Sequence, residues 1–279
     1  MIPYFKTSGA GNDFLALPEP ERAPAVDEIR AWCRRGLSLG ADGVFVLRRR
    51  PGPPGSRAAV TMDYFNADGG GADLCLNGTR CAARVAFHLG WAGGEVEVVT
   101  GIGPVLARGL ADGRISLELP PPSAPRERRV EAAGRGVLGF RVDVGVPHFV
   151  VPWDGGLAAA PLAELAPPLR RHPAFGAAGA NVDLVRFPSR DGFELRTWER
   201  GVEGETLACG TGVLAAAAVG LALGRLALPA TARTAGGFPM TVAVAGGGGW
   251  TLAGDARILA RGELLPEAAS VPEPTAWAD

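Results

Sequence analysis

An internal repeat limits the folds that this chain can adopt. The segment Cys75 to Gly90 reads CLNGTRCAARVAFHLG, and the segment Cys209 to Gly224 reads CGTGVLAAAAVGLALG. At a constant offset of 134 residues, seven of the 16 positions are identical, including the cysteine, one turn glycine and the closing glycine. An offset near half of the 279 residues fits a duplicated domain. The repeat therefore predicts an α+β fold of two similar lobes, each with strands wrapped around a central helix.

Apolar periodicity predicts where the elements of the two lobes lie. Helices are predicted near residues 26–35, 79–89 and 212–223, and the last of these is apolar on nearly every side, as expected of an enclosed helix. Strand-like segments are 43–47, 59–64, 96–99, 114–119, 139–144, 148–151, 182–187, 193–198, 240–245, 250–252 and 256–259.

The boundary between the lobes is predicted from a change in composition. Residues 119–129, LPPPSAPRERR, are proline-rich and then charged, with no apolar period, which is typical of a linker. We expect an N-terminal lobe over residues 1–120, completed by residues 258–279, and a C-terminal lobe over residues 121–257.

Charge and hydropathy exclude several classes of protein. The formal net charge of −1 lacks the basic excess that a nucleic-acid partner requires. Residues 1–17 are not apolar enough for a signal peptide, and the most apolar run, residues 213–224, is too short to span a bilayer. The four cysteines are too few for a disulfide scaffold and should stay reduced. These features favour a cytoplasmic protein without nucleic-acid or membrane partners.

The motifs of the common cofactors are missing. A pyridoxal-phosphate enzyme needs a Schiff-base lysine, and Lys6 is the single lysine of the chain. No C-x-x-C pair occurs, and His88, His148 and His172 have no metal-ligand spacing. Neither the P-loop pattern nor the nucleophile-elbow pattern is present. We therefore expect no metal and no cofactor.

The two repeat helices carry the chemistry that the sequence suggests. A thiol at a helix N-terminus faces free backbone N–H groups and the positive end of the helix dipole, which lower its pKa. Inverting a stereocentre by proton transfer needs a base on one face and an acid on the other, and a thiolate and a thiol supply both. Cys75 and Cys209 are candidates for this pair, and the alternative is that they are small buried residues. Cys33 and Cys81 fit the structural interpretation better.

Two further groups of residues are candidates for binding a small charged ligand. The composition of the chain disfavours amide side chains, since glutamine is absent. The asparagines that remain are therefore candidates, and they are Asn12, Asn66, Asn77 and Asn181. Glu199 and Arg200 follow a predicted strand ahead of Cys209. An arginine there can bind a carboxylate through two hydrogen bonds, and the alternative is a surface Glu–Arg pair.

Four segments resemble the diaminopimelate epimerase family: FKTSGAGNDF (5–14), FNADGGGADLCLNGTRC (65–81), GVPH (145–148) and WERGVEGETLACGTG (198–212). The resemblance runs from Phe5 to about Gly262 in the family's order. It implies a cofactor-independent isomerase that interconverts LL-2,6-diaminopimelate and meso-diaminopimelate. It also implies an α+β fold of two pseudo-symmetric lobes, each a mostly antiparallel β-sheet or barrel wrapped around a central α-helix. A homodimer and a cytosolic role in lysine and peptidoglycan precursor biosynthesis are implied as well.

The resemblance assigns roles to individual residues. It implies that Cys75 and Cys209 are the acid/base pair, and that His148 and Glu199 tune the two thiols. The turns that follow the cysteines match the family's cradle for the substrate's α-carboxylate. The implied substrate contacts are Asn12, Asn66, Leu76, Asn77, Asn181, Glu199, Arg200, Gly210 and Thr211.

Three positions depart from the family's pattern. Leu76 stands where glycine is usual, so its backbone N–H can donate only if the side chain points away from the ligand. Val146 stands where many members have asparagine, which removes a polar contact expected at the far end of the substrate. The stretch from Gly201 to Cys209 is one residue longer than the commonest spacing, with Glu203 as the insertion.

Two other functions remain open from the sequence. A related racemase or epimerase would use the same scaffold on another amino acid, as Val146 and Leu76 suggest. A non-catalytic amino-acid-binding or thiol-redox protein would form a reversible Cys75–Cys209 disulfide and would exchange no α-proton. Epimerisation by two bases instead predicts entry of solvent deuterium at the α-carbon and loss of activity in both cysteine-to-alanine variants.

Overall fold

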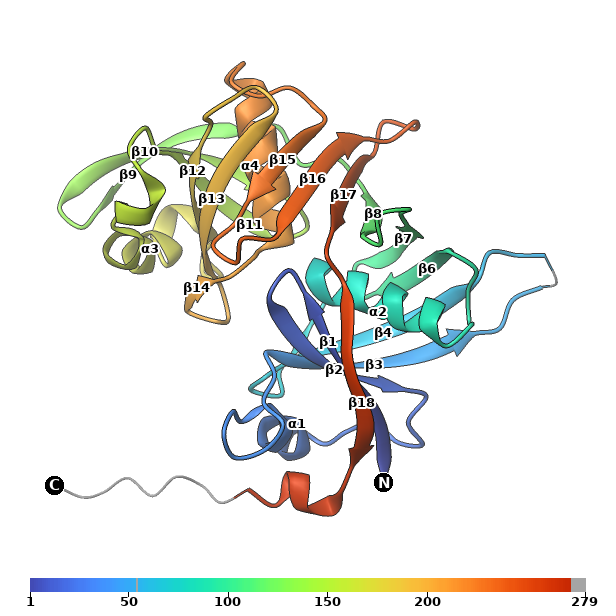
Figure 1. Cartoon of the computed structure of the whole chain (residues 1–279). Helices are drawn as coiled ribbons and strands as arrows, with labels where there is room; N and C mark the ends of the chain where they lie inside the picture. Colours follow the sequence, from blue (N-terminus) through green and yellow to red (C-terminus); the bar gives the residue numbers. More distant parts are fainter. Residues whose placement is uncertain (54, 272–279) are drawn as a thin grey trace, which may run out of the picture.

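The predicted duplication is present in the order of the elements. The computed structural model describes residues 1–53 and 55–271, and Figure 1 shows two lobes, each with one long helix among its strands. The N-terminal lobe contains β1 (Ile2–Gly9), β2 (Asn12–Pro18), β3 (Gly43–Arg50), β4 (Ala59–Asn66), β5 (Gly71–Ala72), β6 (Glu95–Thr100), β7 (Gly103–Gly109) and β8 (Ile115–Leu119). Its helices are α1 (Val26–Cys33) and α2 (Leu76–His88).

The second half of the chain repeats this order. It contains β9 (Arg126–Ala132), β10 (Arg135–Asp143), β11 (Pro147–Pro152), β12 (Asn181–Arg186), β13 (Gly192–Glu199), β14 (Gly204–Thr206), β15 (Ala230–Arg233), β16 (Pro239–Val244), β17 (Trp250–Gly254) and β18 (Arg257–Leu264). Its helices are α3 (Leu162–Arg170) and α4 (Gly210–Ala222). Short 3-10 turns lie at Leu157–Ala159, Pro173–Phe175 and Pro266–Ala269.

The two lobes share their strand pairings as well. β2 pairs with β3 in parallel, as β11 does with β12. β4 pairs with β6 in parallel, as β13 does with β15. The remaining pairs are antiparallel, so a mostly antiparallel sheet wraps around α2 in one lobe and around α4 in the other (Figure 1). The expected α+β fold of two pseudo-symmetric lobes is confirmed.

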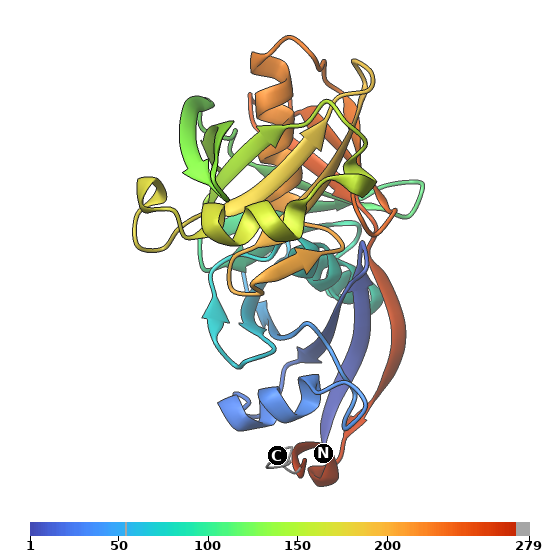
Figure 2. The same cartoon turned by 90° about the vertical axis from the view of Figure 1, so that its left-hand side faces the viewer.

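The lobes are joined by a pair of equivalent strands. β8 and β17 run antiparallel, with Leu119 opposite Trp250 and Ile115 opposite Gly254. The chain then passes into β18, which lies along β1 of the N-terminal lobe (Figure 2). β18 thereby takes the place beside β1 that β9 takes beside β10. Of the segment expected to complete the N-terminal lobe, residues 272–279 lie outside the described residues.

The prediction of a linker over residues 119–129 is wrong for its charged half. Residues from Arg126 onward form β9, in which Arg126 pairs with Arg141 of β10. The first four residues of β9 are exposed, so their side chains stay in water while the backbone pairs. The strand carries charged side chains on its outer surface, which edge strands tolerate, and the charge pattern concealed the pairing.

Helix α3 was not predicted, because two prolines interrupt its pattern. Pro167 and Pro168 lie inside the helix, where proline removes backbone donors and is disfavoured. Its apolar residues are nevertheless buried and pack in one cluster with strands of the C-terminal lobe; they are Leu162, Leu165, Ala166 and Leu169. Tertiary burial thus outweighs the poor local propensity.

Helices α2 and α4 begin earlier than their apolar period predicts, directly after Cys75 and Cys209. Both contain 13 residues, and every residue of α4 from Gly210 to Gly220 is buried. Within residues 1–53 and 55–271, no helix has the length and apolar character needed to cross a membrane.

Candidate active site

Each predicted catalytic cysteine is the N-cap of its helix. Cys75 has φ −138° and ψ 99°, and Cys209 has φ −118° and ψ 110°, so both lie in extended backbone just before the first helical turn. The Gly78 backbone N–H donates to Cys75 Sγ at 3.4 Å. Both cysteines therefore lie at the positive dipole end of their helices, as the sequence predicted, and Cys75 Sγ accepts a hydrogen bond from the first helical turn.

The two cysteine turns lie against each other, although they are far apart in the sequence. Asn77 Nδ2 donates to the carbonyl of Ala208, the residue before Cys209, at 2.8 Å. Leu76 is 3% exposed and packs on Gly210, where an added Cβ would lie 2.9 Å from the Leu76 Cβ. The side chain of Leu76 is therefore buried between the two turns, and its backbone N–H remains at the helix terminus.

Burial dominates the electrostatics of both thiols. It raises the pKa of Cys75 to about 12, partly offset by the Gly78 N–H and the Tyr64 hydroxyl. It also raises the pKa of Cys209 well above its usual value, and the carboxylates of Glu199 and Asp183 add to this. Both thiols are thus protonated at neutral pH when the protein binds no ligand, in contrast to the lowered pKa expected from the helix dipole alone.

Glu199 ends β13 and acts electrostatically on both thiols. Burial raises the pKa of Glu199, while the neighbouring Thr206 hydroxyl opposes the rise. Arg200 follows directly and is partly buried. Adjacent acidic and basic groups at this edge can bind the ammonium and carboxylate groups of a zwitterion.

His148 lies at the centre of a buried polar chain that ends at Cys209. Its Nδ1 is 2.7 Å from Asp183 Oδ2, and its Nε2 is 3.0 Å from Thr211 Oγ1. Thr211 Oγ1 is in turn 3.3 Å from Cys209 Sγ. His148 and Asp183 are 0% exposed. The predicted tuning residue is thus connected to one thiol, Cys209, through a single hydroxyl.

Asn181 connects this chain to the Glu199–Arg200 corner. Its Oδ1 accepts from the Arg200 backbone N–H at 2.7 Å, and its Nδ2 lies 3.2 Å from His148 Nε2. Asn181 is 4% exposed. Its amide therefore orients the imidazole and fixes the backbone next to Glu199.

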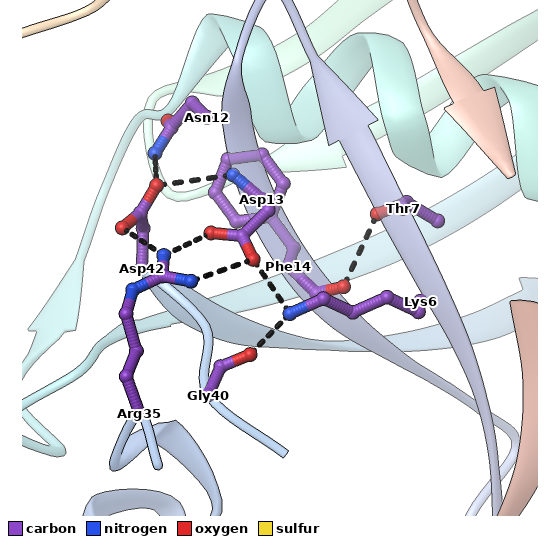
Figure 3. Close-up of polar contacts among 8 residues, drawn as sticks. All are labelled: Lys6, Thr7, Asn12, Asp13, Phe14, Arg35, Gly40 and Asp42. Atoms are coloured by element: carbon purple, nitrogen blue, oxygen red, sulfur yellow. Dashed lines mark hydrogen bonds and ion pairs between the residues drawn. The ribbon is translucent and has the colours of Figure 1, made fainter. Parts of the chain in front are cut away.

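Asn12 is held at the start of β2 by a network of charged groups (Figure 3). A two-residue turn at Ala10 and Gly11, both with positive φ, connects β1 to β2 and delivers Asn12 to the end of the sheet. Asn12 Nδ2 donates to Asp42 Oδ2 at 2.6 Å, and Asn77 Nδ2 approaches Asn12 Oδ1 at 3.5 Å. The amide nitrogen of Asn12 is thus engaged, and its oxygen faces the cysteine turns.

Salt bridges support this arrangement of Asp42. Arg35 pairs with Asp13 at 2.5 Å and with Asp42 at 2.8 Å. Lys6 pairs with Asp13 at 2.6 Å and also contacts the Gly40 carbonyl. The one lysine of the chain is therefore engaged in structural contacts, and Figure 3 shows these charges gathered around Asp13. Among residues 1–53 and 55–271, no three His, Cys, Asp or Glu side chains gather where they could hold a metal ion.

The structure also places the remaining predicted residues. Asn66 ends β4, opposite Gly43 in the strand register. Val146 is partly buried in the turn before β11, where its carbonyl accepts from the Val144 N–H at 3.1 Å. Glu203 adopts a positive φ of 55° and pairs with Arg170 of α3 at 2.8 Å. The proposed insertion is thus anchored on α3, beside the turn that leads to Cys209.

Three functional neighbours were missed from the sequence. Asp42 orients Asn12, and Asp183 binds His148. Arg80 is 0% exposed and donates to Asn77 Oδ1 at 2.6 Å. Two of them carry a signal in the sequence. Asp183 is a charged residue inside the apolar segment VDLV of β12, and Arg80 is a charged residue where the repeat has Leu214.

The family model for diaminopimelate epimerase matches residues 4–121 and 140–258 of this chain. A diaminopimelate epimerase from Gemmatimonas aurantiaca is 39% identical over 232 residues, which cover 77% of this chain and 78% of that protein. The diaminopimelate epimerase from Aquifex aeolicus is 35% identical and covers 78% of this chain and 81% of its own length. That from Methanothrix thermoacetophila is 36% identical, with 88% and 90% covered.

Solved structures of lower identity share the fold. A predicted epimerase from Pseudomonas aeruginosa superposes with a TM-score of 0.68 at 19% identity, covering 95% of this chain and 99% of that one. A hydroxyproline epimerase from Agrobacterium vitis superposes with a TM-score of 0.60 at 17% identity, covering 94% and 91%. Together with the matched family model and the relatives above, the paired cysteine turns show that this chain belongs to the diaminopimelate epimerase family.

Proposed function

We propose that this protein interconverts LL-2,6-diaminopimelate and meso-diaminopimelate by proton transfer between two cysteines, without a cofactor. The observation that carries the proposal is the contact between the two cysteine turns. Cys75 and Cys209 cap equivalent helices, and Asn77 of one turn donates to Ala208 beside the other cysteine. Two thiols from duplicated lobes can then address opposite faces of one small ligand.

The helix termini supply the site for the α-carboxylate. The first backbone N–H groups of a helix have no partner within the helix, and they attract anions. Leu76 and Asn77 open α2, and Gly210 and Thr211 open α4. These donors hold the carboxylate between the lobes and stabilise the negative charge that develops as the α-proton leaves.

The reaction is a proton relay across the α-carbon. A thiolate on one side removes the α-proton and becomes a thiol, and the α-carbon becomes a carbanion. The thiol on the opposite side donates its proton to the other face and becomes a thiolate. Configuration is inverted with no net gain or loss of protons, and the reverse reaction exchanges the roles of Cys75 and Cys209.

The distal half of the substrate also carries an ammonium and a carboxylate. We assign Glu199 and Arg200 to these two groups, with Asn66, Asn181 and Asn12 as amide contacts. The partly buried position of Glu199 and the fixed backbone of Arg200 support this assignment, because preorganised polar groups bind charge without large rearrangement.

A second candidate function is epimerisation or racemisation of another amino acid. Val146 favours it, because an apolar side chain stands in the turn before β11, next to the site residue His148. A substrate with a less polar distal end would suit that surface. Assaying a panel of amino acids for loss of optical activity distinguishes the two functions.

We place the enzyme in the cytoplasm, in lysine and peptidoglycan precursor biosynthesis, and as a homodimer. The role in biosynthesis follows from the family's reaction. Within residues 1–53 and 55–271, β18 pairs with β1 alone and Leu259 is 52% exposed, which supports association through this strand. Sedimentation of the purified protein tests the dimer independently of activity.

Incubation with LL-diaminopimelate in deuterium oxide tests the function. Proton NMR should show formation of the meso isomer together with deuterium at the α-carbon. Cys75→Ala and Cys209→Ala should each abolish epimerisation. Full activity in either variant would exclude the two-base mechanism, and activity on a different amino acid alone would favour the second candidate.

A further inference from the structure

The strands beneath the two thiols carry different side chains at equivalent positions of the two lobes. In the C-terminal lobe, His148 of β11 lies opposite Asn181 of β12, and Asp183 lies opposite Thr197 of β13. All four side chains are buried. Polar groups therefore fill the space between these strands and the N-terminal end of α4.

Three of the four equivalent positions in the N-terminal lobe are aromatic, and the fourth is Gly43. Phe14 of β2 lies opposite Gly43 of β3, and Phe45 lies opposite Tyr64 of β4, in the same register. Phe14 is in edge contact with Tyr64, with ring centroids 5.9 Å apart, and in tilted contact with Phe45 at 6.1 Å. Phe14, Phe45 and Tyr64 thus stand where the other lobe has His148, Asp183 and Thr197.

The carboxylate of Asp183 is held by two hydrogen bonds and lies against Gly212 of α4. Oδ2 is 2.7 Å from His148 Nδ1, and Oδ1 accepts from the Thr197 hydroxyl at 2.6 Å. A Cβ on Gly212 would lie 2.5 Å from Oδ1, so only glycine admits the carboxylate beside the first turn of α4. The positive end of the helix dipole there stabilises a buried anion. In the N-terminal lobe, the Cβ of a substituted Gly78 would meet Met62 Cε instead, at 2.8 Å.

The hydrogen bonds determine which nitrogen of His148 carries its proton. A carboxylate can only accept, so His148 Nδ1 carries the hydrogen that Asp183 receives. The Arg200 N–H donates to Asn181 Oδ1, which turns the Asn181 amide nitrogen, a donor, toward His148 Nε2. Nε2 is therefore an acceptor and the imidazole is neutral. Its unprotonated nitrogen faces Thr211, and Thr211 faces Cys209.

We propose that Asp183 is a positioning residue which, through His148 and Thr211, prepares Cys209 and not Cys75 to give up its proton. The Cys209 S–H bond breaks as its proton bonds to Thr211 Oγ1, and the Thr211 hydroxyl proton bonds to His148 Nε2. A thiolate and an imidazolium result, so total charge is unchanged. Asp183 then neutralises the imidazolium.

Such an acceptor resolves a difficulty in the two-base reaction. The cycle must start with one thiolate and one thiol, yet burial favours the protonated form of both. The titratable groups around Cys209 are Glu199 on β13 and Asp183 on β12, which act on it directly, and His148 on β11, which reaches it through Thr211. Of these, His148 is the one that can receive a proton and become a cation.

One-sided isotope exchange tests this proposal, which rests on the proposed function. In deuterium oxide, the Cys75→Ala variant retains Cys209, and the Cys209→Ala variant retains Cys75. Each can exchange the α-proton of one stereoisomer of diaminopimelate without inverting it. Asp183→Asn should slow exchange at least about tenfold in the Cys75→Ala background, and change it by less than about twofold in the Cys209→Ala background. Equal losses in both backgrounds would overturn the proposal.

A milder variant guards against misfolding of Asp183→Asn. Thr197→Val removes one hydrogen bond to Asp183 at nearly constant volume. It leaves the hydrogen-bonded series Asp183, His148, Thr211 and Cys209 unchanged in sequence. It should slow exchange by Cys209 about threefold and leave exchange by Cys75 unchanged. An effect on both thiols would indicate a general structural role.

A titration without substrate separates the proposal from the proposed function. Thiolate ultraviolet absorbance, recorded for Cys75→Ala minus the Cys75→Ala, Cys209→Ala double variant, isolates Cys209. If Asp183 acts only as a nearby negative charge, Asp183→Asn lowers the pKa of Cys209. If it positions His148, the substitution raises that pKa by about one unit, a tenfold change. A lowered pKa would refute the proposal even in an active epimerase, and a raised one would support it whatever the substrate.

Discussion

Leu76 of α2 packs directly on Gly210 of α4, and their contact sets how closely the two cysteine turns approach. A Cβ on Gly210 would lie 2.9 Å from Leu76 Cβ and 3.3 Å from Leu76 Cδ1. Leu76 is 3% exposed and belongs to the main hydrophobic core. The side chain that replaces the family's usual glycine is therefore a packing residue between the lobes, and it points away from solvent.

We expect Gly210→Ala to lower kcat at least about tenfold. Its methyl group must displace Leu76 or Leu252, and overpacking of a core costs about 1–3 kcal/mol. Displacement at this position also moves Cys209 relative to Cys75. The measurements are kcat with diaminopimelate and the denaturant midpoint.

The double variant Leu76→Gly, Gly210→Ala is the matched control. Removing the Leu76 side chain makes room for the new methyl group, so the double variant should recover much of the kcat lost in Gly210→Ala. Strict additivity of the two losses would contradict a direct contact.

Gly212→Ala should be far more damaging than Gly78→Ala, although the two glycines are repeat equivalents. The added methyl at residue 212 would meet Asp183 Oδ1 at 2.5 Å, and this carboxylate is fixed by His148 and Thr197. At residue 78 it would meet the flexible end of Met62 at 2.8 Å. We expect a large loss of epimerisation and stability in the first variant and a small one in the second. Equal losses, measured by isomer formation and thermal unfolding, would show that the difference between the lobes is unimportant.

The sequence predicted the parts of this protein that depend on local pattern. The repeated cysteine–glycine–helix pattern predicted the duplication, because the segments that begin at Cys75 and Cys209 have identical residues at a constant offset. The fold class could be predicted as well, because strand-like apolar segments and a helix that is apolar on nearly every side can be recognised in the sequence. The charge of Asp183 in an apolar strand is visible in the sequence, but its role could not be assigned, because its partner His148 lies 35 residues away and only the parallel register of β11 and β12 brings them together.

Other misses have the same physical origin. Asp42 reaches Asn12 across 30 residues through the pairing of β2 with β3. Strand β9 is charged along its exposed face, and α3 contains two prolines, so local propensity opposes the structure that burial and pairing impose. The lowered thiol pKa predicted from the helix dipole is overcome by desolvation, whose size depends on how completely the folded lobes cover the site.

Asp42→Ala should raise KM several-fold with a smaller effect on kcat. Asp42 accepts from Asn12 Nδ2 at 2.6 Å and from the Asp13 backbone N–H at 3.0 Å, so its removal frees the Asn12 amide to rotate. Asp42→Asn keeps one acceptor oxygen and should lie between wild type and Asp42→Ala. Steady-state kinetics with diaminopimelate check both variants. An unchanged KM in Asp42→Ala would show that Asn12 needs no support from Asp42.

Alkylation of Cys75 by iodoacetamide should be slow at neutral pH and accelerate as the pH rises. Burial raises the pKa of this thiol to about 12, and the thiolate is the reactive form. Below that pKa, the thiolate fraction grows about tenfold for each pH unit, so the rate should do the same between about pH 7 and 9. Mass spectrometry locates the modified residue, and Cys75→Ala provides the background from the other thiols. A rate independent of pH over this range would mean that Cys75 is already ionised in the ligand-free enzyme.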